Sequence, residues 1–225
     1  MHRRSVIGCL GSAMTVLAGS PVLSAAPVRM PLPQPSLKGV MSVEQALRAR
    51  RSVRAFADAT LKLEEVSQLL WAAQGVTAPG DHRTAPSAGG LHPLTLHLAA
   101  GRVSGLRPGV YRYEPASHAL AMVAQGDARA RIAAAARQAW IEQAAAIVVV
   151  SADLAKPSAR YRARAQRFVD IEVGHAAQGL TLQAVALGLG VTDVGAFEEA
   201  DLRNAAGLTG VEQPLLLLPI GRPRT

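Results

Sequence analysis

Residues 84–98 read TAPSAGGLHPLTLHL, a run of small residues that leads directly into an alternating pattern. The alternation of apolar and polar side chains over residues 94–98 is typical of a half-buried β-strand. The glycines and small side chains before it allow the backbone to approach a planar ligand closely. This stretch therefore predicts a strand of the central sheet that starts at a ligand-facing loop.

Further strands are predicted on the C-terminal side of this stretch. Residues 109–113 and 119–123 have the pattern of a hairpin, and residues 145–151 that of a fully buried strand. Residues 191–194 and 215–220 complete the predicted strands. The hairpin next to the first strand favours an antiparallel meander.

Helical patterns flank the strands. Residues 42–45 have the spacing of a capping box and predict a short helix that ends near Arg50. Residues 63–74 place their apolar side chains on one face, with Gly75 as the stop signal. The remaining predicted helices span residues 128–143, 164–189 and 202–206. Because strands and helices do not alternate strictly, the sequence predicts an α+β domain with helices packed against a mainly antiparallel sheet.

The N-terminal segment has the composition of a leader. Arg3 and Arg4 precede an uncharged stretch with a small-residue cleavage site, which predicts a signal peptide over residues 1–25 and export to the bacterial periplasm. The paired arginines resemble a twin-arginine signal, with an ordinary secretory leader or a retained anchor as alternatives. Residues 26–40 contain four prolines and predict an exposed linker, so that the domain spans residues 41–225.

Charge and composition exclude several classes of protein. The formal net charge is +8, but the arginines fall in short groups along the chain, which disfavours one nucleic-acid surface. The only cysteine, Cys9, lies in the predicted leader, so a mature chain would have no disulfide and no thiolate nucleophile. The histidines show no metal-ligand spacing, and we predict no metal site.

Three further segments carry candidate chemistry. Residues 50–54, RRSVR, place three guanidinium groups and a hydroxyl at a helix end, where they can bind a phosphate or form a solvated basic surface. Residues 188–197, GLGVTDVGAF, lead from a helix into a strand, the reverse of a Rossmann fingerprint. Residues 219–223, PIGRP, end a buried strand with the cation Arg222.

These four segments, in this order and at these separations, resemble the nitroreductase superfamily over residues 41–223, and in particular its azoline-dehydrogenase branch. The branch pattern is close in residues 85–94, APSAGGLHPL, in residues 172–178, EVGHAAQ, and in residues 186–190, ALGLG. The resemblance implies the nitroreductase-like fold, a homodimer, and one FMN in each of two clefts at the interface between the subunits.

The resemblance also implies roles for individual residues. Those that match flavin-binding positions of the family are Arg50, Arg51 and Ser52 at the ribityl phosphate and flavin edge, Arg54 near N1 and O2, Arg222 at the phosphate, Gly195 and Ala196 as backbone facing N5, and Pro86, Ser87, Ala88 and Gly90 on a loop from the partner subunit. Hydride arriving at N5 leaves negative charge at N1 and O2, which a fixed guanidinium such as Arg54 would stabilise.

The candidate catalytic residues are Arg54, Arg160 and Tyr161. The azoline-oxidising branch has a Lys-Tyr pair where this chain has Arg160 and Tyr161, and an arginine hardly deprotonates, so it cannot act as a base. The implied function is an FMN-dependent oxidoreductase of dehydrogenase or nitroreductase type that works by a ping-pong mechanism. Cleavage of the flavin, NAD(P)H-dependent reduction of nitro or quinone compounds, and a flavin-binding or basic interaction protein without activity remain the alternatives.

Overall fold

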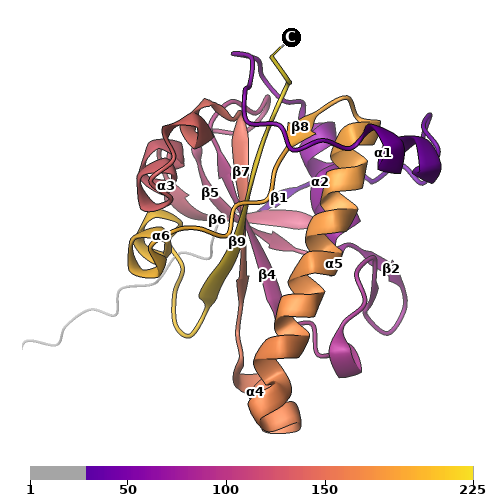
Figure 1. Ribbon diagram of the computed structural model, residues 1–225. Coiled ribbons are helices and arrows are strands. Elements are labelled where there is room, and N and C mark those ends of the chain that lie inside the picture. Colours follow the sequence, from indigo (N-terminus) through magenta and orange to yellow (C-terminus); the bar gives the residue numbers. More distant parts are fainter. Residues whose placement is uncertain (1–28, 225) are drawn as a thin grey trace, which may run out of the picture.

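A seven-stranded sheet forms the centre of the protein, which is described over residues 29–224 of a computed structural model (Figure 1). The strand order is β1-β6-β5-β4-β7-β9-β8, and every neighbouring pair is antiparallel. The predicted α+β class with a mainly antiparallel sheet is confirmed. The strands of this sheet are β1 (Arg29–Pro31), β4 (Leu94–Ala100), β5 (Gly109–Glu114), β6 (Ala119–Gln125), β7 (Ala146–Ala152), β8 (Gly190–Val191) and β9 (Gln213–Gly221).

Helices cover both faces of the sheet, as Figure 1 shows. One face packs against α2 and α5 through a core of mainly leucine, alanine and valine, and the other packs against α3 and α6. A separate two-stranded hairpin, β2 (Val76–Ala78) with β3 (His82–Arg83), follows α2. The helices are α1 (Val43–Ala49), α2 (Leu63–Gln74), α3 (Arg129–Ala135), α4 (Ala155–Tyr161), α5 (Ala165–Ala186) and α6 (Glu199–Ala205), and the 3₁₀ turns are Ala88–Gly90, Ala139–Gln143 and Arg162–Arg164.

Part of the predicted linker belongs to the fold. Arg29–Pro31 pairs antiparallel with β6, and Leu32 is buried. The next residues are held to α2, because the Ser36 N–H donates to Gln68 Oε1 at 2.8 Å. Alternating prolines favour an extended backbone, which suits an edge strand, so residues 29–36 form part of the domain rather than a linker. The predicted leader, residues 1–25, lies outside the described residues and stays a prediction.

The predicted helix over residues 128–143 is broken into α3 and a 3₁₀ turn. Arg137 adopts φ 51°, a left-handed conformation that ends α3, and the Gln138 N–H donates back to the Ala133 carbonyl at 3.1 Å. The break lets Ile141 become fully buried on the α3 side of the sheet. A regular helix pattern alone did not reveal this change of direction.

The other helix predictions agree closely with the structure. The capping box at Ser42 and Gln45 is present, and α2 spans the residues that the periodicity predicts. Gly75 ends α2 for a different reason from the one expected. Its φ is −67°, so no left-handed cap forms, and a Cβ there would lie 2.1 Å from the Trp71 ring. The glycine allows the indole of Trp71 to lie against the backbone. Within residues 29–224, no helix has the length and apolar character needed to cross a membrane.

Gly179 sets the distance between α2 and α5. A Cβ at this position would lie 2.6 Å from the Ala72 carbonyl oxygen, a backbone atom that cannot move alone. We expect Gly179→Ala to lower the free energy of unfolding by about 1–3 kcal/mol, because the two helices must separate. Gly174→Ala is the matched control on the same helix, since a Cβ there meets nothing within 4 Å. Urea denaturation of both variants checks this, and an equally stable Gly179→Ala protein would contradict the packing argument.

Candidate functional site

Three of the four predicted segments meet at one edge of the sheet. Residues 52–57 run between β8 and the C-terminal end of β9, with the Val53 N–H donating to the Val191 carbonyl at 3.1 Å and the Ala57 N–H to the Arg222 carbonyl at 2.9 Å. Gly190 permits this approach, since a Cβ there would lie 2.6 Å from Val53 Cγ1. Segments that are more than 130 residues apart in the sequence are thus joined by main-chain hydrogen bonds.

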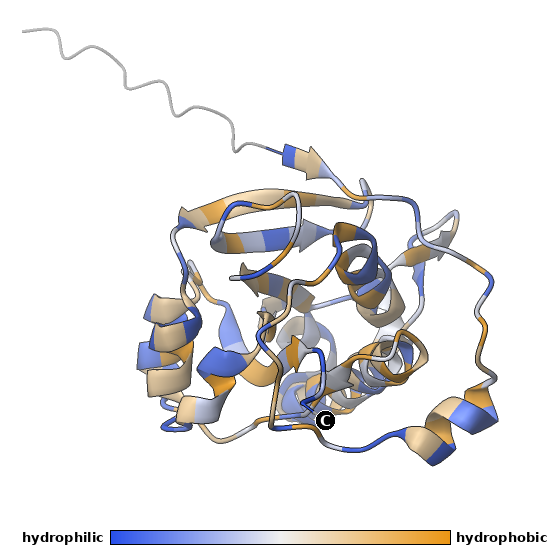
Figure 2. Ribbon diagram, turned by 90° about the horizontal axis from the view of Figure 1, so that it is seen from above, coloured by the Kyte–Doolittle hydropathy of each residue, from blue (hydrophilic) through white to orange (hydrophobic). Residues whose placement is uncertain are grey.

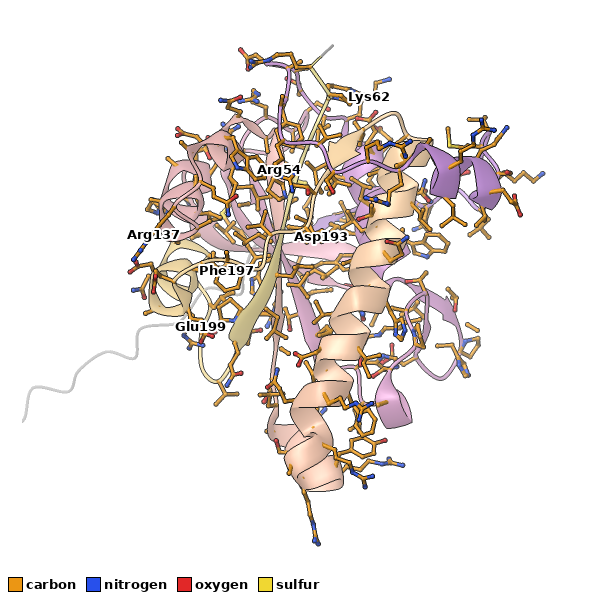
Figure 3. All side chains as sticks on the ribbon, viewed as in Figure 1. Arg54, Lys62, Arg137, Asp193, Phe197 and Glu199 are labelled. Atoms are coloured by element: carbon orange, nitrogen blue, oxygen red, sulfur yellow. The ribbon has the colours of Figure 1, made fainter. Side chains whose placement is uncertain are left out.

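The side chains of residues 50–54 differ in what they can bind. Ser52 and Arg54 are exposed, and Arg54 lies in the same region of the front face as Asp193 (Figure 3). Arg51 turns back onto α1, where Nη1 donates to the Arg48 and Arg50 carbonyls at 2.9 and 2.8 Å. Arg51 therefore caps the C-terminal end of α1, which differs from its expected place beside a ligand.

Asp193 adds an acidic group to this basic edge. The surrounding protein desolvates its carboxyl and raises its pKa, while the nearby charge of Arg50 acts in the opposite direction. The sequence analysis did not single out Asp193. Its place as the only charged residue of the glycine-rich segment 188–197 was the available signal.

Arg222 carries its own counter-ion. Its Nη2 lies 2.5 Å from Glu65 Oε1, and Nη1 donates to the Leu187 carbonyl at 3.5 Å. The second carboxylate oxygen of Glu65 accepts the Lys62 N–H at 2.9 Å and closes the first turn of α2. Sequence reasoning missed Glu65, because its spacing from Lys62 indicates only a helix cap. The expected phosphate cation is thus held and partly neutralised by a carboxylate.

The turn after β8 exposes main-chain groups next to this cluster. Gly195 and Ala196 are both exposed, and the space around Gly195 is open, since a Cβ there would meet nothing within 4 Å. Val194 anchors the turn by two hydrogen bonds of 2.9 Å with the backbone of Leu217. A rigid strand therefore presents a free stretch of backbone beside the cations.

The fourth segment, residues 84–93, lies elsewhere. Its tip is the 3₁₀ turn Ala88–Gly90, in which Gly89 and Gly90 both have φ 64°. The Ser87 hydroxyl oxygen accepts the His92 N–H at 2.9 Å and closes the loop. Pro86 and Gly90 are exposed, and nothing lies within 4 Å of a Cβ at Gly90. The loop presents an open backbone surface, as the small residues predict.

Arg160 and Tyr161 lie against this loop. A Cβ at Gly89 would be 2.5 Å from the Tyr161 hydroxyl and 3.0 Å from the Arg160 guanidinium carbon. The Arg160 guanidinium lies 5.6 Å from the centre of the Tyr161 ring, which in turn packs edge-on against Phe168 at 4.7 Å. Glycine at position 89 therefore allows both side chains to lie over the loop tip.

Glu172 lies beneath the same loop and was missed as a site residue. Only 2% of it is exposed, and its Oε1 has no hydrogen-bond partner within the described part of the chain. Burial raises the pKa of this carboxyl, and a hydrogen bond from Ser87 partly offsets that effect. A charged residue on the buried face of α5, between Val169 and Val173, was the signal that could have indicated it.

The predicted site residues thus form two groups at opposite ends of α5. The group of Arg50, Arg54 and Arg222 lies at the C-terminal end, and the group of Ser87, Arg160 and Tyr161 lies at the N-terminal end (Figure 1). A helix of 22 residues is ~33 Å long. A ligand the size of a flavin mononucleotide cannot contact both groups of one chain.

Known proteins resemble this chain over most of its length. The profile of the nitroreductase family matches residues 47–222. A protein of Methanocaldococcus jannaschii assigned to the nitroreductases is 37% identical over 183 residues, which cover 81% of this chain and 91% of that protein.

Solved structures share the fold. A protein of Ralstonia eutropha assigned to the nitroreductases superposes with a TM-score of 0.76 at 28% identity, over 88% of this chain and 90% of that one. The NADPH:FMN oxidoreductase of Vibrio harveyi, solved with NAD+, has a TM-score of 0.59 at 18% identity, over 81% of this chain and 69% of that one. From the profile, the archaeal relative and the shared fold, we conclude that this chain belongs to the nitroreductase family.

Proposed function

We propose that this protein is an FMN-dependent oxidoreductase whose site is completed by a second copy of the chain. The separation of the two residue groups along α5 carries the proposal, because a shared site is the simplest way to bring the Ser87 loop to the Arg54 edge. Membership of a family of oxidoreductases and the FMN named for the Vibrio harveyi neighbour support the choice of cofactor.

The cluster at the end of β9 fits the phosphate of FMN. Arg50, Ser52 and Arg222 offer two guanidinium groups and a hydroxyl, and charge-assisted hydrogen bonds of this kind bind phosphate strongly. Arg54 is exposed and forms no ion pair with any residue from 29 to 224, so its charge is available to a ligand. The exposed main chain at Gly195 provides room for a planar ring.

A dimer is supported by apolar residues that this chain leaves uncovered. Leu37, Val40, Val43 and Leu47 are 82%, 100%, 65% and 53% exposed, and all lie on α1 or the arm before it. Figure 2 shows α1 standing off from the body of the domain. Exposed apolar residues that lie close together in the chain favour an interaction surface, and a second copy would bury them.

The residues of this chain would bind and orient the reactants rather than carry the electrons. When bound, FMN would supply the redox chemistry by taking a hydride from one substrate and passing electrons to another. Arg54 would provide a fixed positive charge where negative charge develops, and the Gly89 loop would limit which molecules stack in the cleft. Arg160 could orient a substrate or stabilise an anion, but it could not act as a base.

The finer assignments rest on the sequence. We place the chain near the azoline-dehydrogenase branch because of residues 85–94 and 172–178, although Arg160 in the place of lysine argues against azoline oxidation. The leader predicted over residues 1–25 implies export from the cytoplasm, and reduced nicotinamides are scarce outside it. We therefore favour a dehydrogenase over an NAD(P)H-dependent nitroreductase.

Purification of the protein tests the proposal. We expect a yellow dimer with the absorbance of oxidised flavin, bleached by dithionite and restored by air. FMN added to the apoprotein should bind at least about tenfold more tightly than riboflavin, which lacks the phosphate, because a charge-assisted phosphate contact contributes about 1.5–3 kcal/mol. A colourless protein that binds no added FMN would remove the cofactor assignment, and a monomer with full flavin occupancy would remove the shared site.

A further inference from the structure

Five exposed cations gather at the end of the molecule formed by α4, the turn after it and the first turn of α5. They are Lys156, Arg160, Arg162, Arg164 and Arg167. Residues 153–170 contain only two acids, Asp153 and Asp170, so five positive minus two negative charges leave this segment, called here the basic end, at +3. Figure 1 shows α4 at the end of α5 that is far from β8.

The cations of the basic end pair with no acid in the described part of the chain. None of the five lies within 4.0 Å of a carboxylate among residues 29–224, whereas several other arginines do. The arginines that do pair are Arg29 and Arg112 with Glu114, Arg83 with Asp81, Arg102 with Asp58, Arg129 with Asp127, Arg137 with Glu198 and Arg222 with Glu65.

The two local acids are engaged elsewhere. Asp153 Oδ1 accepts the Ala155 N–H at 2.8 Å, and Asp170 Oδ1 accepts an N–H from Gln166 at 2.8 Å. Neither carboxylate forms an ion pair with any of the five cations within residues 29–224, so the positive charge of the basic end stays open to a ligand.

The basic end adjoins the Gly89 loop tip. Arg160 and Tyr161 lie directly over Gly89, and the Tyr161 and Phe168 rings form an aromatic surface beside it. Contact of the Arg160 guanidinium with the Tyr161 ring holds the cation at the loop rather than free in solvent. A planar molecule with a negative group would find an aromatic surface and a fixed guanidinium next to each other.

We infer that the basic end selects an anionic, planar organic substrate, one that carries a carboxylate or phosphate group. The inference rests on the proposed function, which places the Gly89 loop at the flavin of the other copy. Arginines keep their charge at all physiological pH values, and a field of one sign raises the local concentration of oppositely charged substrate. Carboxylate and guanidinium also match in geometry, which gives Arg160 a directional contact.

Equilibrium binding tests the inference without turnover. Benzoate and benzamide have nearly the same shape and differ in charge, and calorimetry with the purified protein measures both. At 20 mM salt we expect benzoate to bind at least about fivefold more tightly, with the preference lost at 500 mM salt through screening. Equal binding of the two at low salt would overturn the inference.

Single-turnover kinetics add a second readout. The flavin-loaded protein, reduced by light and EDTA, is mixed with 4-nitrobenzoate or 4-nitrobenzamide, and reoxidation is followed by absorbance. We expect 4-nitrobenzoate to react about fivefold faster per unit concentration at low salt. If the protein bound no flavin, the proposed function would be wrong. Calorimetry would still show whether the protein prefers benzoate to benzamide. Equal rates in a protein that binds flavin would overturn the inference alone.

Substitutions locate the selective charge. Arg160→Gln and Arg164→Gln should each reduce the benzoate preference about two- to fivefold, without changing flavin content. Arg131→Gln is the matched control, because Arg131 is also exposed but lies on α3 at the other face of the sheet. An equal loss in the control would indicate a general charge effect and would overturn the assignment to the basic end. Competition of benzoate by a short DNA duplex at the same site would overturn it in favour of nucleic acid.

Discussion

Replacing Arg222 by alanine is expected to weaken FMN binding about 100-fold. A charge-assisted hydrogen bond to phosphate contributes about 1.5–3 kcal/mol, and each 1.4 kcal/mol corresponds to a factor of ten in Kd. The loss should fall at the upper end, because Glu65, which lies 2.5 Å from the guanidinium of Arg222, would then repel the phosphate. Fluorescence titration of the apoprotein with FMN measures the effect.

Glu65 permits a stricter version of this experiment. In the native chain, Glu65→Gln should tighten FMN binding a few-fold, because Arg222 loses its competing counter-ion. In the Arg222→Ala background, the same substitution should restore part of the lost affinity. Glutamine retains an acceptor for the Lys62 N–H, so the start of α2 stays closed.

Arg224→Ala is the control for the Arg222 series. Arg224 is two residues after Arg222 and carries the same charge. Its side chain donates to the Phe56 carbonyl at 3.2 Å. An Arg222→Ala protein with unchanged affinity would remove this residue from the phosphate site.

Much of the architecture could be predicted because it follows from local patterns. The strands from β4 to β7 and the helices α2 and α5 have clear local patterns of apolar residues, and their predicted bounds differ from the observed ones by a few residues. Features that depend on tertiary contacts were missed. Residues 29–36 look like a proline-rich linker until β6 offers them an edge, and Arg137 interrupts a helical pattern that continues in the sequence.

The candidate site was predictable in its parts but not in its arrangement. The resemblance assigns Arg50, Arg54 and Arg222 to one function, and the backbone pairing of residues 52–57 with β8 and β9 brings them to one edge. The sequence could not reveal that Arg51 caps α1 or that Glu65 pairs with Arg222, because both depend on where a side chain turns in the folded protein. It also could not place Arg160 over Gly89, since that contact joins segments 71 residues apart.

The second large effect concerns Arg54. We expect Arg54→Ala to lower the two-electron reduction potential of bound FMN by about 30–60 mV, because a reduced flavin carries negative charge near N1 and O2, which the guanidinium would stabilise. For a two-electron couple 30 mV corresponds to about 1.4 kcal/mol, the size expected for one charge-assisted hydrogen bond. Photoreduction against a reference dye measures the potential.

Two controls separate a contact of Arg54 with the flavin from a general change in charge. Arg51→Ala removes the same charge three residues away, but the Arg51 guanidinium is bound to the carbonyls at the end of α1, so the potential should hardly change. Arg54→Lys retains the charge and should recover most of the native potential, although not the planar geometry. If Arg51→Ala and Arg54→Ala lower the reduction potential equally, the change in potential comes from net charge, and Arg54 makes no specific contact with the flavin ring. A drop confined to Arg54→Ala, with FMN affinity nearly unchanged, would separate its role from that of Arg222 at the phosphate.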